Sequence, residues 1–477
     1  MDSVKNIKKQ DNKDSSKDLT VGSPYKVMIG FAMPILVSQI FQQLYNTADA
    51  FVVGQSLGTN ALAAVTSSGT LIFLMISFVL GAAMGAGVVI SRYFGADNRE
   101  KVEKAIHTTM ALGLISGLVL TVVGVAFTPT FLRWMKTDPE VLPYAIEYFR
   151  YYFLGSLAMV MYNACRGVMN AVGDSRRPLY YLVFSSLINI VLDYLFLEGF
   201  GWGVWSAAVA TVISQAASVV LCLAHLMKKG RVYSVYLKKL KVDRGMLREI
   251  IRFGLPSGVQ NSVIAFANVI VQSQINSFGG TATAAFGVHA KIEGFAFLPI
   301  TSFNMATTTF ISQNLGAKKY ERVKKGARFG ILSAVIAAEL IGVICYIAAP
   351  VLIPLFDDAE QVVRLGTSQA HIVALFYCLL AFSHAVAAVC RGAGKAFVPM
   401  FVMLSVWCVF RVAYIAVVTT FFDDIRLIYW AYPITWSISS VIYLIYYLKS
   451  DWIHGFETES IPIRKRISRL FCKEQGI

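Results

Sequence analysis

The two halves of this sequence follow one plan, at an offset of 221 or 222 residues. The segment ISRYFGA at 90–96 returns as ISQNLGA at 311–317, and FAMP at 31–34 returns as FGLP at 253–256. A hydrophobic chain built from two similar halves is expected to form two similar bundles with a cavity at their interface. The duplication therefore restricts the fold more than any other feature of the sequence.

Long apolar segments place both halves in a membrane. Apolar residues make up 56% of the chain and charged residues 15%, and the segment 105–127 contains no Asp, Glu, Lys or Arg. A helix of about 20 such residues spans a bilayer. We therefore predict an all-α membrane protein with twelve transmembrane helices, six in each half. Because six is an even number, the halves form two parallel six-helix bundles around a central cavity.

Basic residues are distributed unevenly between the two sides of this predicted topology. Of the 43 Lys and Arg residues, 36 fall on the side that carries both termini and four on the other side. Positively charged loops stay in the cytoplasm, so both termini are predicted to be cytoplasmic. The same bias explains the net charge of +15 without a nucleic-acid partner. Residues 1–26 lack the apolar core of a cleavable signal peptide.

The composition divides the chain into five parts. A polar tail, which is expected to be disordered, precedes the first lobe, and a basic linker separates the two six-helix lobes. The predicted boundaries are 1–25 for the cytoplasmic tail, 26–227 for the N-terminal lobe, 228–250 for the cytoplasmic linker, 251–448 for the C-terminal lobe and 449–477 for a basic cytoplasmic tail.

Two aspartates lie inside predicted spans of the first half. Asp49 follows Gln39, Gln42 and Asn46 at helical spacing, and Asp193 follows Asn189 by one turn. An ionised side chain inside a bilayer costs at least about 3 kcal/mol, so a buried acid needs a compensating interaction. Polar groups of this kind often only join neighbouring helices. Two carboxylates with amide partners also form a site for a proton or a small hard cation.

The second half repeats the geometry without the acids. Val271, Phe410 and Tyr414 stand where the first half has Asp49, Asn189 and Asp193, so the coupling site is expected in the first half only. Polar residues of the first span in each half are expected to line the substrate cavity: Gln39, Gln42, Tyr45, Asn46, Gln260 and Asn261. Pro34 removes a helical hydrogen bond and is expected to act as a hinge.

Charge in the second half is scattered. Lys291, Glu293, Glu339 and Arg411 fall inside predicted spans. We expect a structural salt bridge between Glu339 and Arg411. The sequence leaves open whether Glu339 or Glu293 also contributes to a substrate site.

Several of these segments resemble the MATE (multidrug and toxic compound extrusion) transporters, and the DinF-like bacterial branch most. The similarity covers residues from about 25 to 450 and includes LYNTAD at 44–49, Asn189 with Asp193, the two Gly-Ala loops, and RGAG at 391–394. The resemblance implies a two-lobed, twelve-helix antiporter of a bacterial cytoplasmic membrane that expels organic cations in exchange for Na⁺ or H⁺.

The resemblance also assigns individual residues. It implies a cation-coupling site, able to bind Na⁺, at Asp49, Asn189, Asp193 and Thr211, and it places a family proline at Pro34. The NorM-like branch has further acids where this chain has Ile264 and Leu380, so a second Na⁺ site in the C-terminal lobe is not expected.

We therefore predict a secondary antiporter for cationic amphipathic organic compounds, with no cofactor besides the coupling ion H⁺ or Na⁺. The alternative is a flippase for lipid-linked oligosaccharides, whose cavity would need a ring of Arg and Lys. The chain lacks the Gly-x-Gly-Asp motif of intramembrane aspartyl proteases and any P-loop, so neither an enzyme nor an ATP-driven pump is expected. The expected partners are small organic cations and membrane lipids, with no nucleic acid and no ATPase subunit, and the expected state is a monomer.

Overall fold

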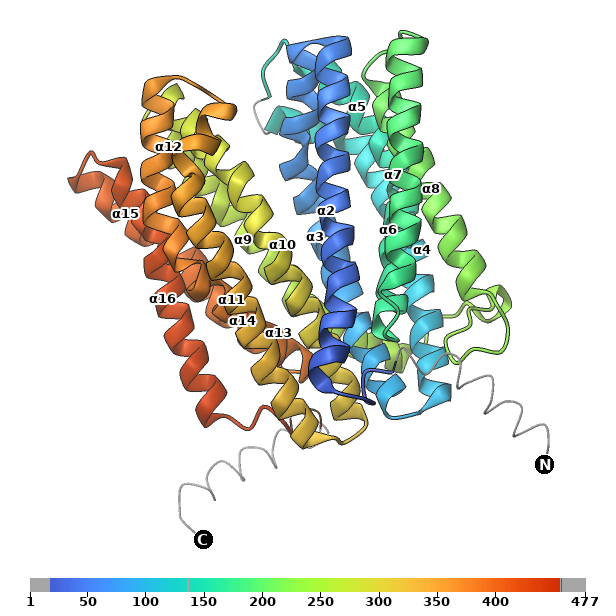
Figure 1. Ribbon diagram of the computed structural model, residues 1–477. Coiled ribbons are helices and arrows are strands. Elements are labelled where there is room, and N and C mark those ends of the chain that lie inside the picture. The colour runs from blue at the N-terminus through green and yellow to red at the C-terminus, as the bar shows by residue number, and fades with distance from the viewer. Residues whose placement is uncertain (1–17, 135–136, 455, 457–477) are drawn as a thin grey trace, which may run out of the picture.

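The computed structural model describes residues 18–134, 137–454 and 456, and it contains two helical bundles that stand side by side (Figure 1). The first bundle, the N-terminal lobe, contains α2 (Pro24–Leu57), α3 (Thr59–Gly95), α4 (Arg99–Trp134), α5 (Leu142–Leu154), α6 (Ser156–Ala171), α7 (Arg176–Tyr194), the π-helical η2 (Leu195–Gly199) and α8 (Trp205–Leu226). Because α5 continues into α6, and α7 into η2, these elements make six long rods.

The second bundle, the C-terminal lobe, has the same arrangement. After the short 3₁₀ turn η3 (Leu237–Lys239) it contains α9 (Arg244–Asn276), α10 (Gly280–Gly316), α11 (Tyr320–Leu352), η4 (Ile353–Leu355), α12 (Glu360–Val373), η5 (Ala374–Phe376), α13 (Tyr377–Gly392), α14 (Phe397–Met403), the π-helical η6 (Leu404–Phe410), α15 (Arg411–Phe421) and α16 (Ile425–Lys449). Joining the short elements end to end again gives six rods. The predicted all-α fold with two six-helix repeats is confirmed.

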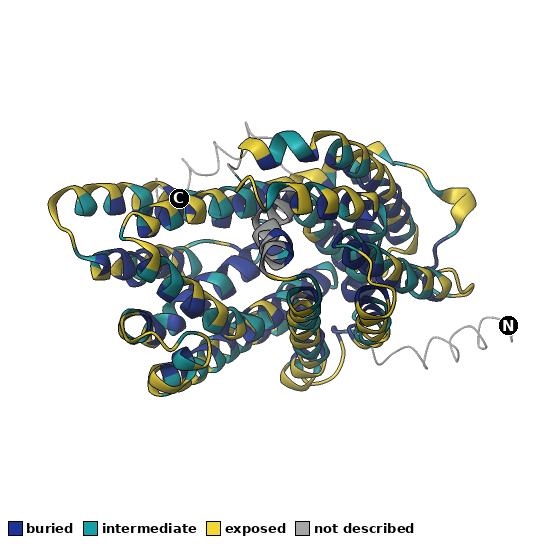
Figure 2. Cartoon of the chain, turned by 90° about the horizontal axis from the view of Figure 1, so that it is seen from above, coloured by how far each residue is buried: buried dark blue, intermediate teal, exposed yellow. Residues whose placement is uncertain are grey.

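The outer surface of the bundles suits a lipid environment. Eight of the described helical segments are long and apolar enough to cross a membrane. Buried residues gather inside each bundle, whereas exposed residues line the outside (Figure 2), and many of the exposed ones are large and apolar, including Leu118, Val122, Leu340 and Ile347. An apolar exterior of this extent is stable in a bilayer and not in water.

The internal repeat is visible in single hydrogen bonds. Ser91 Oγ donates to the carbonyl of Ala171 at 3.0 Å, and Ser312 Oγ, 221 positions later, donates to the carbonyl of Gly392 at 2.9 Å. Each bond fixes the end of the second helix of a lobe to the end of its fourth rod. The duplicated sequence segments therefore perform the same structural task in each lobe.

The lobes meet at the end of the molecule that carries residues 18–23 and 450–454, which we call the terminal face, and they diverge toward the opposite end (Figure 1). Helices α3 and α9 cross here at glycines: a Cβ atom on Gly254 would lie 2.7 Å from the carbonyl oxygen of Gly81, and one on Gly85 would collide with the backbone of Gly254. Small residues let the two backbones touch. The terminal face is therefore closed by direct helix contact.

The segment 18–22 reinforces this closure. The backbone N–H of Leu19 donates to Gln313 Oε1 at 3.1 Å, the Asn314 side chain donates to the carbonyl of Leu19 at 3.2 Å, and Lys319 Nζ donates to the carbonyl of Thr20 at 2.8 Å. Gln313 also donates to the carbonyl of Ala171 in the other lobe, at 2.7 Å. The end of the sequence that was expected to be a disordered tail is therefore packed at 18–22, while residues 1–17 lie outside the described residues.

The linker between the lobes is shorter than its composition indicates. Helix α9 begins at Arg244, inside the basic segment 228–250, because Asp243 accepts a hydrogen bond from the N–H of Met246 at 2.9 Å and caps the helix. The C-terminal segment 449–477 is described only at 449–454 and 456.

Candidate functional site

Three helices of the N-terminal lobe bring the four predicted coupling residues together. Asp49 lies on α2, Asn189 and Asp193 on α7, and Thr211 on α8, and α7 packs against both other helices. All four side chains are buried: Asp49 is 7% exposed and Asp193 is fully covered. Asn189 Nδ2 donates to Thr211 Oγ1 at 3.5 Å, and Thr211 Oγ1 donates to the carbonyl of Ala207 at 3.1 Å.

The cluster has more acceptors than donors. One carboxyl oxygen of Asp49, both carboxyl oxygens of Asp193 and the amide oxygen of Asn189 are buried and have no hydrogen-bond partner. The two carboxyl groups face each other closely enough to interact. Within the part of the chain that the structure describes, neither acid forms an ion pair with Lys or Arg. Buried acceptors without donors are costly, and a proton or a small cation would satisfy them.

The chemistry of these ligands suits Na⁺ as well as H⁺. Asp49, Asn189, Asp193 and Thr211 offer only carboxylate, amide and hydroxyl oxygens, which are the ligands that hard cations prefer. A proton shared by two adjacent carboxyl groups would relieve the same repulsion. The donor set therefore fits either coupling ion.

Three tyrosines surround the acids. Tyr45 on α2 and Tyr148 and Tyr152 on α5 lie within electrostatic range of Asp49, and Tyr45 also reaches Thr211. The rings of Tyr148 and Tyr152 stack with their centroids 6.0 Å apart. The sequence interpretation missed Tyr148 and Tyr152, although their spacing of four places them on one helix face. Three hydroxyl-bearing rings therefore lie near Asp49.

A cavity of about 350 Å³ adjoins this cluster and shares Tyr45 and Tyr152 with it. The cavity lies among α2, α3, α5, α6, α7 and α8, and its lining is polar and aromatic with one cation: Gln42, Tyr45, Asn46, Ile76, Leu80, Tyr152, Met159, Tyr162, Asn163, Arg166, Leu182, Ser185, Ser186, Ser214, Gln215 and Ser218. A ligand in the cavity would therefore contact Tyr45 and Tyr152, two tyrosines that lie within electrostatic range of Asp49.

Arg166 was not expected in this cavity. The sequence places it at the end of the fourth span, but α6 runs from Ser156 to Ala171 and carries Arg166 on the same face as Tyr162 and Asn163. The interval of three and four residues was the available signal.

The six predicted substrate-cavity residues divide into two groups. Gln42, Tyr45 and Asn46 line the N-lobe cavity. Gln39 instead bridges the lobes, because its side-chain nitrogen donates to Ser302 Oγ at 3.1 Å and its oxygen accepts from Thr301 Oγ1 at 2.6 Å.

The other two members come from α9. Gln260 is buried inside the C-terminal lobe, with its nitrogen 2.6 Å from Met403 Sδ, and the adjacent Asn261 is half-buried. Neither residue lines the N-lobe cavity. The six residues predicted to line one substrate cavity therefore lie in three places: the N-lobe cavity, the contact between the lobes, and the interior of the C-terminal lobe.

The predicted hinge residue lies inside a continuous helix. Helix α2 runs from Pro24 through Pro34 to Leu57, and Ser38 Oγ donates to the carbonyl of Pro34 at 2.9 Å. Pro34 therefore weakens the backbone ladder without breaking the helix in this conformation.

The predicted salt bridge between Glu339 and Arg411 is wrong. Glu339 accepts the backbone N–H of Cys378 at 3.0 Å, whereas the Arg411 guanidinium, 2% exposed, donates to Thr435 Oγ1 at 2.9 Å and lies 4.5 Å from the ring centroid of Tyr432. Hydroxyl and aromatic groups therefore contact Arg411 in place of Glu339.

The other two charged residues that the sequence places inside spans of the second half are Glu293 and Lys291. Glu293 lies within electrostatic range of Arg411, and Lys291 Nζ lies 5.6 Å from the ring centroid of Phe356. Nothing in this arrangement resembles the paired acids of the N-terminal lobe.

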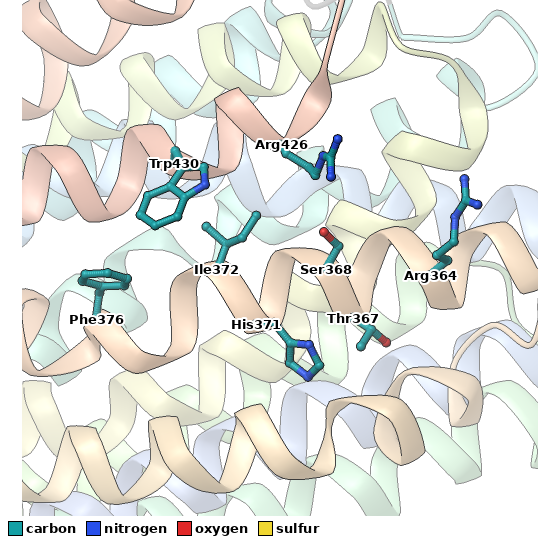
Figure 3. Close-up of a pocket in the computed structure, with 8 residues that line it drawn as sticks. All are labelled: Arg364, Thr367, Ser368, His371, Ile372, Phe376, Arg426 and Trp430. Atoms are coloured by element: carbon teal, nitrogen blue, oxygen red, sulfur yellow. The ribbon is translucent and has the colours of Figure 1, made fainter.

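A pocket of about 560 Å³ in the C-terminal lobe, between α12 and α16, has different chemistry (Figure 3). Arg364 and Arg426 lie at one end of it and Phe376 and Trp430 at the other. Its lining contains no carboxylate, so it does not suit a coupling cation.

Comparison with known proteins supports the MATE family, which the sequence motifs already resembled. The family model MatE matches twice, at residues 34–195 and 256–417, once for each repeat. Two similar proteins are the probable multidrug resistance protein YoeA of Bacillus subtilis (strain 168), at 28% identity over 89% of this chain and 94% of the relative, and the probable multidrug resistance protein NorM of Thermotoga maritima, at 25% identity over 93% and 96%.

A solved structure with the same fold describes the outward-facing conformation of a multidrug resistance MATE family transporter of the MOP superfamily. It aligns with a TM-score of 0.84 and 24% identity, over 91% of this chain and 97% of that chain. The likeness covers both lobes and agrees with the predicted architecture. On the double match of its family model, this chain is a member of the MatE family of membrane transporters.

Proposed function

We propose that this protein is a secondary antiporter that exports cationic amphipathic organic compounds in exchange for H⁺ or Na⁺. Two relatives are named as multidrug resistance proteins, which supports multidrug efflux as its role. The observation that carries the proposal is the pair Asp49 and Asp193, two buried and facing carboxyl groups to which no cationic side chain among the described residues is bonded.

The proposed cycle begins in a conformation like the one described, with the terminal face closed. We place this face in the cytoplasm, because 36 of the 43 Lys and Arg residues lie on its side of the predicted topology. An inorganic cation from outside binds Asp49 and Asp193 and compensates their charge. The neutralised site then lowers the cost of moving these groups when the lobes exchange their open and closed ends.

Exchange follows from competition at a shared wall. Once the terminal side opens, loss of the inorganic cation restores negative charge beside Tyr45 and Tyr152, which also line the cavity. Negative charge and aromatic rings both attract an organic cation. The two ligands therefore exclude each other by charge, and the coupling is a difference in affinity between two states.

The remaining parts of the proposal concern the surroundings. We propose a monomer in a bacterial cytoplasmic membrane, powered by an ion gradient without an ATPase subunit, with lipids and small organic cations as its partners. The flippase alternative gains no support from the N-lobe cavity, whose lining has one cation, Arg166, and not a basic ring.

The test uses purified protein in liposomes with tetraphenylphosphonium as the organic cation. Proton and sodium gradients are imposed separately, and efflux is expected to accelerate under one of them. Asp193→Asn is expected to abolish the acceleration, whereas Glu140→Gln, an exposed acid outside the lobe interior, is expected to preserve it. Equal efflux with and without both gradients would contradict antiport.

A further inference from the structure

Another pocket, lined by residues of both lobes, lies on the terminal face, away from the N-lobe cavity. Its volume is about 1180 Å³, somewhat above the range of about 300–1,000 Å³ that is typical of small-ligand sites. Four segments supply most of its lining: 18–21, the Gly-Ala loop at 94–99, the start of the basic linker at 229–233, and the second Gly-Ala loop at 316–319. Val102, Val172 and Arg177 complete it. The first Gly-Ala loop belongs to one lobe and the second to the other.

The walls of this terminal-face pocket are strongly basic. Six lining residues are cations: Arg99, Arg177, Lys229, Arg231, Lys318 and Lys319. The lining acids are Asp18 and Asp97, and Asp174 lies 2.8 Å from Arg177. After these acids are counted, a positive excess remains, concentrated in a concave site where protein walls strengthen the field.

Internal bonds hold part of this basic wall in place. Arg231 Nη1 lies 2.7 Å from His225 Nε2, and Lys319 Nζ donates to the carbonyl of Thr20 at 2.8 Å. Beneath them Tyr233, 4% exposed, and Val172 form a packed floor. Membrane topology explains why basic residues lie on this side, but it does not require them to be folded into one pocket.

We propose that the terminal-face pocket binds a phosphate-bearing anion, and that the bound anion stabilises the closed arrangement of this face. Lysine and arginine clusters recognise phosphate through charge-assisted hydrogen bonds. The phosphate comes either from a soluble polyphosphate or from the headgroup of an anionic lipid, and the chemistry of recognition is the same.

The link to conformation follows from how the two Gly-Ala loops meet. A Cβ atom on Gly316 would lie 3.1 Å from the backbone nitrogen of Ala96, and one on Gly95 would lie 2.6 Å from the backbone carbon of Gln313. These contacts break when the lobes separate at this face, and the pocket loses one of its walls. A ligand that needs both walls must favour the closed state by its difference in affinity.

The binding test uses the full chain in nanodiscs of neutral phosphatidylcholine, with inorganic pyrophosphate as the soluble probe and sodium chloride at equal ionic strength as the control. Pyrophosphate is expected to raise the melting temperature in a saturable manner, because it binds only the folded protein. A parallel series replaces part of the neutral lipid with phosphatidylglycerol. A response to pyrophosphate identifies a soluble ligand, and a response to phosphatidylglycerol alone identifies a lipid headgroup.

Variants locate the response. Lys229→Gln with Lys318→Gln is expected to weaken binding at least about tenfold. Lys104→Gln with Lys325→Gln removes the same charge from the same face, at repeat-related positions outside the pocket lining, and is expected to leave binding unchanged. No response to either phosphate source, or an equal loss in both double variants, would overturn the proposed site.

A separate measurement tests whether the bound anion stabilises the closed terminal face. Spin labels at Lys104→Cys and Lys325→Cys, one on each lobe, report the separation of the lobes at the terminal face. The phosphate source that binds is expected to enrich the shorter distance. Binding with an unchanged distance distribution would refute the stabilising role, and neither experiment depends on which ion drives transport.

Discussion

Asp49 and Asp193 are buried acids that helix packing alone does not explain. Each lies inside a helix bundle with unsatisfied acceptor atoms, in a setting where apolar side chains would pack at lower cost. At the equivalent positions of the second lobe the chain has Val271 and Tyr414. The C-terminal lobe therefore adopts the same fold without acids at these two positions. This asymmetry supports the proposal that the acids serve the N-terminal lobe alone.

Replacing either aspartate with asparagine removes the negative charge and keeps the size and shape of the side chain. Asp49→Asn and Asp193→Asn are each expected to lower gradient-driven export by at least about tenfold, equivalent to about 1.4 kcal/mol in the barrier, because the amide binds no proton and attracts Na⁺ weakly. Expression and melting temperature are expected to stay the same or rise. Export at the wild-type rate in either variant, measured in the same liposomes, would remove the acid from the coupling step.

Replacing Arg166 is expected to strengthen the binding of an organic cation, whereas replacing the acids is expected to impair its export. It is the cation in the N-lobe cavity lining, and it repels a positively charged ligand there. Arg166→Gln is expected to tighten tetraphenylphosphonium binding by about threefold to tenfold, as measured by titration calorimetry. Arg133→Gln, at an exposed position on α4, is the control. Weaker binding in Arg166→Gln would show that the arginine supports the ligand site.

At the scale of helices, α2 and α9 are repeat partners with a proline at the same place, and only α2 carries an acid after that proline. Pro34→Ala restores a backbone hydrogen bond in α2 and stiffens it. We expect export to fall by about tenfold while the affinity for the organic cation changes little. Pro256→Ala makes the same change in α9 and is expected to have the smaller effect. Equal effects of the two substitutions would contradict a hinge role that is specific to Pro34 in α2.

The crossing of α3 and α9 makes a second prediction at this scale. Gly85→Ala would force a methyl group into the backbone of α9 and is expected to destabilise the protein by about 1–3 kcal/mol. Gly87 lies two positions further along α3 and faces open space, so Gly87→Ala is expected to preserve or raise stability. A thermal unfolding series of both variants checks this, and a lower melting temperature for Gly87→Ala than for Gly85→Ala would contradict the helix crossing.

Helix existence followed from apolar spacing, but side-chain direction did not. The fourth rod was predicted as one span, and the structure interrupts it at Gly155, where a Cβ atom would lie 2.9 Å from Val212 Cβ. Arg166 follows this break by eleven residues and lines the cavity. The Glu339 to Arg411 pair failed for the same reason, since the rotation of each helix depends on its packing partners and not on its own sequence.

At the scale of the whole molecule, the duplication predicted the two lobes and their common topology, and the location of the acids predicted a functional difference between them. What the sequence could not supply is how the lobes meet. The closed terminal face depends on glycines of α3 and α9, on segment 18–22 and on a bridge from Gln313 to Ala171. These contacts join residues far apart in the chain. The glycines of α3 and α9 recur at a spacing of four, but that spacing does not reveal which helix each one meets.

The central claim is that one inorganic cation and one organic cation exclude each other at the acid pair. Calorimetric titration of purified protein with tetraphenylphosphonium, at stepped pH and at stepped Na⁺ concentration, measures this directly. The account predicts that the apparent affinity of the wild-type protein falls as the coupling cation rises, and that Asp49→Asn combined with Asp193→Asn removes the dependence. An affinity that is independent of both cations in the wild type, or equally dependent in the double variant, would contradict it.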